Sequence, residues 1–348
     1  MERSLNDTQN DNNENDFSFS DQDVRNATFL AYYDAVSDKM VKKEHKCCIF
    51  LGGQPGSGKS TMVKEIDPAD EFVHVDLDRY RRYHPYYDQI CERYQEKAQE
   101  YTNQFAYLVK QGIIQNLSDA GYNFIIDGTL RDAESQIETA LELHEKNYSI
   151  QADVICTKPE ISSIRTDLRY EVQMKMYHSY EGADFPRAVG DDYHDMVCKH
   201  LPNSLEKLQN ALIPTGEPLF DKITFHHSDQ RKPVVIKHDG TSAKQYLENF
   251  YESAFTEGEL SAFHDDVRKT ISYKESRNAA DLSHFIQKEQ LLEKRIGVKS
   301  KTDSPISKDN SSVSNKVSPT SAYQQTLAAF EDLGLDNDFG IDYDYEFK

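Results

Sequence analysis

A glycine-rich loop that follows an apolar run is the feature that most constrains this sequence. Residues 46–61 read KCCIFLGGQPGSGKST, so four residues separate Gly53 from Gly58, and Lys59 and Ser60 follow. This is the P-loop pattern in its proper context, with a buried-type strand before it and a helical pattern after it. Such a loop turns backbone N–H groups toward a β-phosphate, while its lysine reaches the β- and γ-phosphates and its serine hydroxyl ligates Mg²⁺. We therefore expect ATP and Mg²⁺ as cofactors, held by Gly53, Gln54, Pro55, Gly56, Ser57, Gly58, Lys59, Ser60 and Thr61, with Ser60 on the metal.

Charge and composition separate a folded centre from two polar ends. The 348 residues carry a formal net charge of −20 and contain no tryptophan, and the mean hydropathy is −0.76. Residues 1–27 hold seven acidic and two basic side chains, and residues 330–348 hold seven acidic and one basic side chain. So acidic a chain disfavours nonspecific binding to nucleic acid or to anionic membranes, without excluding a local basic pocket for phosphates.

The compartment is predicted from cysteines and apolar runs. The sequence has five scattered cysteines, no CxxC pair, no apolar run of membrane-spanning length and no apolar signal segment at its start. We expect a cytoplasmic protein that folds in a reducing environment.

Apolar periodicity predicts an α/β layered fold. Short apolar runs at 47–51, 72–76, 122–126 and 150–156 alternate with helical patterns, and 221–227 and 233–237 resemble a closing strand pair. Near-continuous apolar strands indicate a mostly parallel sheet flanked by helices. We divide the chain into a disordered acidic N-terminus, a P-loop kinase-like domain, a helical extension, a disordered linker and an acidic tail, at residues 1–27, 28–240, 241–297, 298–322 and 323–348.

Acidic residues follow two of the predicted strands. Asp76 and Asp78 end the second strand and Asp127 ends the third. Ligands of open α/β sheets lie beyond the carboxyl ends of the strands, where a P-loop kinase needs a carboxylate. One of Asp76 and Asp78 would lie near Mg²⁺ while the other accepts a proton from an acceptor hydroxyl, or both would simply cap the next helix.

Arginines are the second ingredient, because a planar guanidinium can contact two oxygens of a phosphoryl group at once. Arg131, Arg165, Arg169 and Arg187 are candidates, although a single arginine is more often a solvated surface charge.

Six linked segments resemble the zeta toxin family, the P-loop kinases of epsilon–zeta toxin–antitoxin systems. The resemblance covers about residues 29–237 and rests on LGGQPGSGKST (51–61), VDLDRYRRYHP (75–85), LSDAGYNFIIDGTLR (117–131), KPEIS…LRYE (158–171), PRAVGDDYHD (186–195) and KHLPNSLEKL (199–208). It implies a kinase that transfers the ATP γ-phosphate to the 3′-hydroxyl of the sugar in UDP-N-acetylglucosamine. It also implies an inhibitor resembling an antitoxin as a partner.

The resemblance assigns roles to individual residues. Lys59 holds the ATP phosphates and Asp78 falls at the general base. Arg169 and Arg187 fall on two phosphate-stabilising arginines, so Lys59, Asp78, Arg169 and Arg187 form the expected catalytic set. Thr129 and Arg131 fall where the family contacts the nucleotide sugar, as does Asp78.

One position departs from the family pattern. The long helix before residue 117 has Gln111 or Tyr107, depending on the direction of counting, where the family has a substrate-contacting glutamate. A site that hydrogen-bonds its substrate discriminates strongly, so a different nucleotide sugar or a dinucleotide remains an alternative acceptor. A second alternative is a nucleotide-binding protein that acts through partners without turnover, for which the acidic aromatic tail could serve as a recognition segment.

Other polar clusters are weaker signals. His194-Asp195 resembles part of a metal site and His226-His227 lies in a predicted strand, but both are more typical of structural histidines. Arg79, Arg81 and Arg82 alternate with tyrosines, either as a patch for a base or diphosphate or as exposed helix residues.

Overall fold

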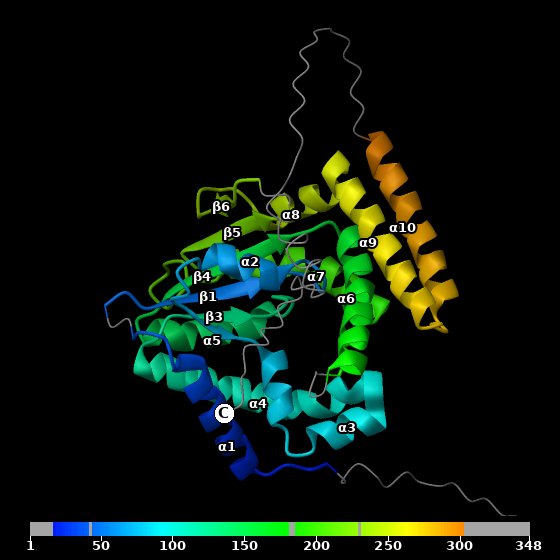
Figure 1. Cartoon of the computed structure of the whole chain (residues 1–348). Coiled ribbons are helices and arrows are strands. Elements are labelled where there is room, and N and C mark those ends of the chain that lie inside the picture. Colours follow the sequence, from blue (N-terminus) through cyan, green and yellow to red (C-terminus); the bar gives the residue numbers. More distant parts are fainter. Residues whose placement is uncertain (1–16, 42–43, 181–184, 229–230, 303–348) are drawn as a thin grey trace, which may run out of the picture.

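A six-stranded, mostly parallel sheet forms the centre of the molecule (Figure 1). The computed structural model describes residues 17–41, 44–180, 185–228 and 231–302. The strand order is β2-β3-β1-β4-β5-β6, and only β6 runs antiparallel to its neighbour β5. The strands are β1 Cys47–Gly52, β2 Val73–Val75, β3 Phe124–Asp127, β4 Ser149–Cys156, β5 Lys222–His227 and β6 Val234–Ile236. The predicted parallel sheet and its closing strand pair are confirmed.

Helices cover both faces of the sheet. They are α1 Asp21–Val36, α2 Lys59–Ile66, α3 Tyr87–Tyr94, α4 Ala98–Ala120, α5 Ala133–Glu145, α6 Pro159–Ser179, α7 Asp191–Asn210, α8 Ala243–Glu252, α9 Glu257–Ser276 and α10 Leu282–Thr302, with 3-10 turns η1 Leu77–Tyr83 and η2 Gln95–Lys97. Alternate residues of β1 point to opposite faces, because strand side chains have a period of two. Phe50 joins the large core under α1, α4, α5, α7 and α8, whereas Leu51 packs with Met62 of α2.

The helices α8–α10 form a C-terminal extension that packs on the sheet domain. Ile161 and Ile164 of α6 share a buried cluster with aromatic and aliphatic side chains of α9 and α10. None of the helices in the described ranges is long and apolar enough to cross a membrane. The five cysteines are free thiols, as their scattered spacing predicted.

The structure corrects two predicted boundaries. Helix α1 begins at Asp21, inside the segment predicted to be disordered, because Ser20 and Asp23 form a reciprocal capping box. Helix α10 continues to Thr302, beyond the predicted start of the linker at residue 298. The remainder of the predicted N-terminal disorder, the linker from 303 and the acidic tail lie outside the described residues.

Candidate functional site

The P-loop leaves the carboxyl end of β1 and closes over the amino end of α2. Gly58 is the N-cap of α2, with φ of +88°. Gly56 has φ of +76°, and a Cβ at this position would lie 2.1 Å from the Ser162 carbonyl oxygen. Only glycine adopts a positive φ of this kind without strain, which accounts for Gly56 and Gly58. Gly56 also lies too close to α6 to carry a side chain. The turn aims the backbone N–H groups and the positive end of α2 at one place, which suits an anion.

The buried amide of Gln54 ties the loop to three other parts of the chain. Its Nε2 donates hydrogen bonds to the Thr157 carbonyl oxygen at 2.6 Å and to Ser162 Oγ at 3.2 Å. Its Oε1 accepts a hydrogen bond from the Tyr251 hydroxyl of α8 at 3.0 Å. Thr157 Oγ1 in turn donates to the Ser57 carbonyl oxygen at 2.8 Å. The loop is therefore fixed before any phosphate arrives.

Lys59 is the cation at the floor of the loop. Its Nζ donates a 3.2 Å hydrogen bond to the Gly53 carbonyl oxygen. Burial lowers the pKa of Lys59, and the neighbouring Asp127 counteracts this effect. Ser60 and Thr61 are exposed on the first turn of α2, which leaves the Ser60 hydroxyl accessible to a bound metal ion.

Carboxylates from β2 and β3 meet at the same edge of the sheet. Leu51 of β1 is paired with Asp127, and Val75 is paired with the residue before it, which places Asp76 beside Asp127. Burial and the neighbouring Asp78 and Asp127 raise the pKa of Asp76. Burial alone would raise the pKa of Asp127 as well, but nearby His74 and Lys59 hold it below its ordinary value.

Lys110 of α4 is a half-buried cation at this edge that was not predicted from the sequence. Its Nζ donates a 3.2 Å hydrogen bond to the Asp127 carbonyl oxygen, and burial lowers its pKa. An isolated lysine in a helical pattern gives no sequence signal for such a position.

Asp78 is held by two arginines. Arg81 Nε donates to Asp78 Oδ1 at 2.8 Å, and Arg187 forms an ion pair with Oδ2. Burial alone would raise the pKa of Asp78, but the Arg187 and Arg81 guanidiniums hold it well below its usual range. Asp76 caps η1 by accepting a 3.0 Å hydrogen bond from the Asp78 N–H. The capping role considered for both aspartates therefore describes Asp76, whereas Asp78 faces the cations.

Arg81 is a site residue whose burial the sequence analysis did not predict. It is only 7% exposed, and its guanidinium also donates to the Gln99 carbonyl oxygen and Thr102 Oγ1, both at 3.0 Å, and to Asn103 Oδ1 at 3.1 Å. The interpretation of 79–82 as exposed helix residues is wrong for Tyr80 and Arg81, which are both buried. The three-residue spacing between Asp78 and Arg81 was the available signal.

Arg169 and Arg187 converge on the same place from α6 and from the segment before α7. Burial and the nearby Arg187 lower the pKa of Arg169 to about 10. Its Nε is buried without a hydrogen-bond partner among the described residues. The Arg187 N–H donates to Gln173 Oε1 of α6 at 3.0 Å, which fixes the backbone beside it.

Cations outnumber carboxylates at this edge, in a chain that is strongly acidic as a whole. The cations are Lys59, Arg81, Lys110, Arg169 and Arg187, and the carboxylates are Asp76, Asp78 and Asp127. Such a local excess of partly buried positive charge suits a polyphosphate.

Two candidate arginines lie elsewhere. Arg165 pairs with Asp266 of α9 at 3.0 Å, so it is a structural link between helices. Arg131 is exposed, its guanidinium lies 5.3 Å from the Tyr193 ring centroid, and it lines a hollow of about 340 Å³ with residues of α7. Thr129 is half-buried in the turn after β3, where the Gly128 N–H donates to the Leu51 carbonyl oxygen at 3.0 Å.

His194 and His226 have structural partners. His194 Nε2 lies 2.8 Å from Ser162 Oγ, and its Nδ1 lies 3.3 Å from Asp195 Oδ1. His226 Nε2 lies 3.2 Å from Asp153 Oδ2. Across the part of the chain that the structure describes, no group of three or more His, Cys, Asp or Glu side chains could hold a metal ion.

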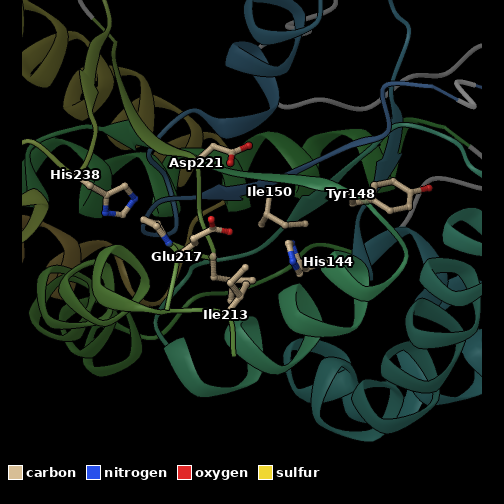
Figure 2. Close-up of a pocket in the computed structure, with 9 residues that line it drawn as sticks. His144, Tyr148, Ile150, Ile213, Glu217, Asp221 and His238 are labelled. Atoms are coloured by element: carbon tan, nitrogen blue, oxygen red, sulfur yellow. The ribbon is translucent and has the colours of Figure 1, made fainter. Parts of the chain in front are cut away.

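A second hollow lies at the other end of the strands. It measures about 410 Å³, and Figure 2 shows Tyr148, the residue before β4, and Ile150 of β4 together with Asp221, the residue before β5. His144 and Glu217 also line it. Because the P-loop leaves the opposite, carboxyl end of the sheet, this hollow is separate from the phosphate site.

Comparison with known proteins agrees with this geometry. The family model described as Zeta toxin matches residues 32–236. The toxin PezT of Streptococcus pneumoniae serotype 4 is 32% identical over 202 residues, which cover 58% of this chain and 76% of that protein. The toxin zeta of Streptococcus agalactiae is 32% identical over 184 residues, 51% of this chain and 61% of that protein, so the match spans less than two thirds of that relative.

A solved structure has the same fold. It belongs to work on the PezAT chromosomal toxin–antitoxin system of the human pathogen Streptococcus pneumoniae, and it matches with a TM-score of 0.64 and 27% identity. The superposition covers 74% of this chain and 98% of that chain.

Proposed function

The chain belongs to the zeta toxin family, and from that premise we propose that it is an ATP-dependent kinase of a small nucleotide-sugar acceptor. The acceptor that the family resemblance favours is UDP-N-acetylglucosamine, phosphorylated on its sugar 3′-hydroxyl. The observation that carries the proposal is the Asp78 carboxylate, which pairs with Arg81 and Arg187 at the edge of the sheet where the P-loop lysine lies. A protein that binds a nucleotide without catalysing a reaction does not need a carboxylate that two arginines hold at this place.

The chain supplies groups for each part of an in-line transfer. The acceptor oxygen attacks the γ-phosphorus while its proton passes to Asp78, and the bond from the γ-phosphorus to the leaving oxygen of ADP breaks. Lys59 and Arg169 face the charge on the equatorial oxygens, and Thr129 and Arg131 would orient the sugar nucleotide. Mg²⁺ held by the Ser60 hydroxyl would neutralise charge on the β- and γ-phosphates. Positioning and charge neutralisation supply most of the acceleration in such a site.

Two anions would compete for the Arg187 guanidinium in this mechanism. It pairs with Asp78 in the structure, and an entering γ-phosphate would compete for the same guanidinium. A shift of Arg187 toward the phosphate would raise the pKa of Asp78 and make it a better proton acceptor. The low resting pKa is therefore compatible with a base.

The direct test is mass spectrometry of UDP-N-acetylglucosamine after incubation with the protein, ATP and Mg²⁺. A product heavier by one phosphate, absent with Lys59→Ala and Asp78→Ala, is the expected outcome. Full activity in Asp78→Ala would remove that residue from the base role. ATP binding without turnover on any acceptor would favour the non-catalytic alternative.

Gln111 favours a second candidate acceptor. It is half-buried on α4, beside Lys110, and it is one of the two positions, with Tyr107, that the resemblance matches to a glutamate of the family. An amide and a carboxylate recognise different partners, because the amide also donates hydrogen bonds. A product screen across other nucleotide sugars and dinucleotides, repeated with Gln111→Glu, would show whether this position sets the acceptor.

The relatives also suggest an inhibitory partner. The matching solved structure concerns a toxin–antitoxin system. By extension, we propose that a partner protein inhibits the present chain by covering its nucleotide site. Such an inhibitor would compete with ATP, so its effect should weaken as the ATP concentration rises.

A further inference from the structure

Helix α6 lies between the phosphate site and the C-terminal extension. One of its faces contacts the P-loop side: Ser162 Oγ accepts from Gln54, and the Thr166 methyl group lies 3.2 Å from where a Gly56 Cβ would be. Arg169 and Gln173 continue this face at helical spacing. The opposite face packs on α9 and α10, and Figure 1 shows α6 running beside α9.

Glu171, two residues after Arg169, forms buried ion pairs on this second face of α6. The Glu171 side chain is fully buried, and its Oε1 accepts from Lys274 Nζ at 2.8 Å and from an Arg277 terminal nitrogen at 2.7 Å. Its Oε2 accepts from Arg277 Nε at 2.6 Å. This is a bidentate arginine–carboxylate pair, which fixes geometry as well as charge. Lys274 Nζ also reaches Asp281, just before α10, at 2.5 Å.

Further links hold the same face along its length. Lys288 of α10 contacts Asp167 at 2.6 Å and Asp191 of α7 at 2.5 Å. Lys299 lies 2.8 Å from Glu160 at the start of α6. These contacts therefore fix the position of α6 along its own axis and its rotation about that axis.

Arg169 depends on this support, because its guanidinium lies in an unfavourable place. A second guanidinium, that of Arg187, lies near it, and its buried Nε has no hydrogen-bond partner among the described residues. A side chain that is not held by its own hydrogen bonds must be aimed by the backbone that carries it.

We propose that Glu171, clamped by Lys274 of α9 and by Arg277, the residue that caps the end of α9, is a positioning residue that holds Arg169 at the phosphate site. The extension, which lies beyond the matched family region 32–236, is then part of the phosphoryl-transfer apparatus. This inference rests on the proposed function, since it requires that Arg169 meets a transferring phosphoryl group.

The test uses Arg277→Gln in the full chain. This substitution removes the bidentate pair but leaves Glu171 paired with Lys274, and Arg277 is a third exposed, so the fold should persist. The measurement is the affinity for ADP alone and for ADP with aluminium fluoride and Mg²⁺, which mimics the transferring phosphoryl group without any acceptor. We expect affinity for the mimic to fall roughly tenfold, with ADP affinity unchanged, because displaced catalytic groups lose mainly transition-state contacts.

A double-mutant cycle separates positioning from general loosening. If Arg277 acts through Arg169, Arg277→Gln should cost nothing more in an Arg169→Ala background. The matched control is Arg268→Gln, which removes an exposed ion pair with Asp265 on the same helix and should leave both affinities unchanged.

Each other outcome overturns the inference in a recognisable way. Equal affinity of wild type and Arg277→Gln for the mimic would show that the clamp does not aim Arg169. Additive losses in the cycle would show that Arg277 acts by another route. A wild-type protein that binds ADP but gains nothing from aluminium fluoride would refute the proposed phosphoryl transfer itself.

Discussion

Arg81 Nε donates a 2.8 Å hydrogen bond to Asp78 Oδ1 from within the same short helix, η1. The arginine is anchored on its other side by the Gln99 carbonyl oxygen, Thr102 and Asn103 of α4, so the carboxylate is held by a group that itself cannot move freely. Together with Arg187, this neighbour orients Asp78 and keeps the pKa of its carboxyl low.

The pH dependence of turnover should reveal this neighbour. The arginines hold the pKa of Asp78 well below its usual range, so wild-type kcat/KM should show no acid limb from this group near neutral pH. Arg81→Gln removes one stabiliser of the charged form, which raises the pKa of Asp78 and moves the acid limb to higher pH. Arg81→Lys keeps the charge and should move it less.

Arg79→Gln is the matched control, since Arg79 is exposed on the same short helix. Superimposable pH profiles for Arg81→Gln and wild type would show that Arg81 does not set the ionisation of Asp78.

Gly56→Ala should impair both folding and nucleotide binding. The positive φ costs a non-glycine residue about 1–3 kcal/mol. The added Cβ would also lie 2.1 Å from the Ser162 carbonyl oxygen, so α6 or the loop must shift. We expect a lower Tm and at least tenfold weaker ATP binding, measured by thermal unfolding and titration calorimetry. Gly190→Ala, where a Cβ meets open space, should change neither.

Tyr251→Phe should lower both the stability of the protein and its affinity for ATP, because Tyr251 supports the P-loop through Gln54. It removes the hydroxyl that donates to Gln54 Oε1 at 3.0 Å and leaves a buried acceptor without its partner, which costs about 1–3 kcal/mol of unfolding free energy. ATP affinity should fall with it. Tyr246→Phe on the same helix removes a hydroxyl 2.8 Å from His227 instead, so it should lower stability while leaving ATP affinity intact. Equal ATP affinities in the two variants would contradict a role for Tyr251 in the loop.

Stability should decline on the acid side of neutrality through His194. Burial lowers the pKa of His194, against the opposing influence of Asp195, and Lys288 lowers it further. The unfolded state then binds more protons than the folded state below the unfolded pKa of about 6.5, so the free energy of unfolding falls as the pH falls through that value. Denaturant titrations between neutral and mildly acidic pH should show this slope. His194→Gln should flatten it, and an unchanged slope in the variant would assign the effect to other groups, such as His84, whose pKa burial also lowers.

Local patterns in the sequence predicted the sheet well. The glycine-rich loop is a short-range signal, and the apolar runs at 47–51, 72–76, 122–126 and 150–156 fall on the parallel strands β1–β4. Gly121, the left-handed C-cap of α4, and Pro159, in the first turn of α6, are equally local features of the sequence. The capping box that starts α1 was also local, but the acidic composition around it concealed the helix start.

Long-range pairing was beyond the reach of sequence reasoning. Arg165 and Arg169 are one helical turn apart, yet Arg165 binds Asp266 of α9 whereas Arg169 faces the phosphate site. Nothing in their immediate sequence separates them, because the distinction depends on which elements cover each face of α6. The same reason explains why Lys110 and Arg81 were missed: burial is a property of the packed fold.

The contact between Gln54 and Tyr251 also has a consequence for the order in which the protein is made. The two residues are 197 positions apart. A ribosome completes the strands β1–β6 before it reaches α8, so the nascent chain holds every residue of the phosphate-binding loop while the loop still lacks its rear support. Synthesis is slow compared with the closing of local contacts. The P-loop therefore gains its rear support only after α8 has been made and has packed behind the loop.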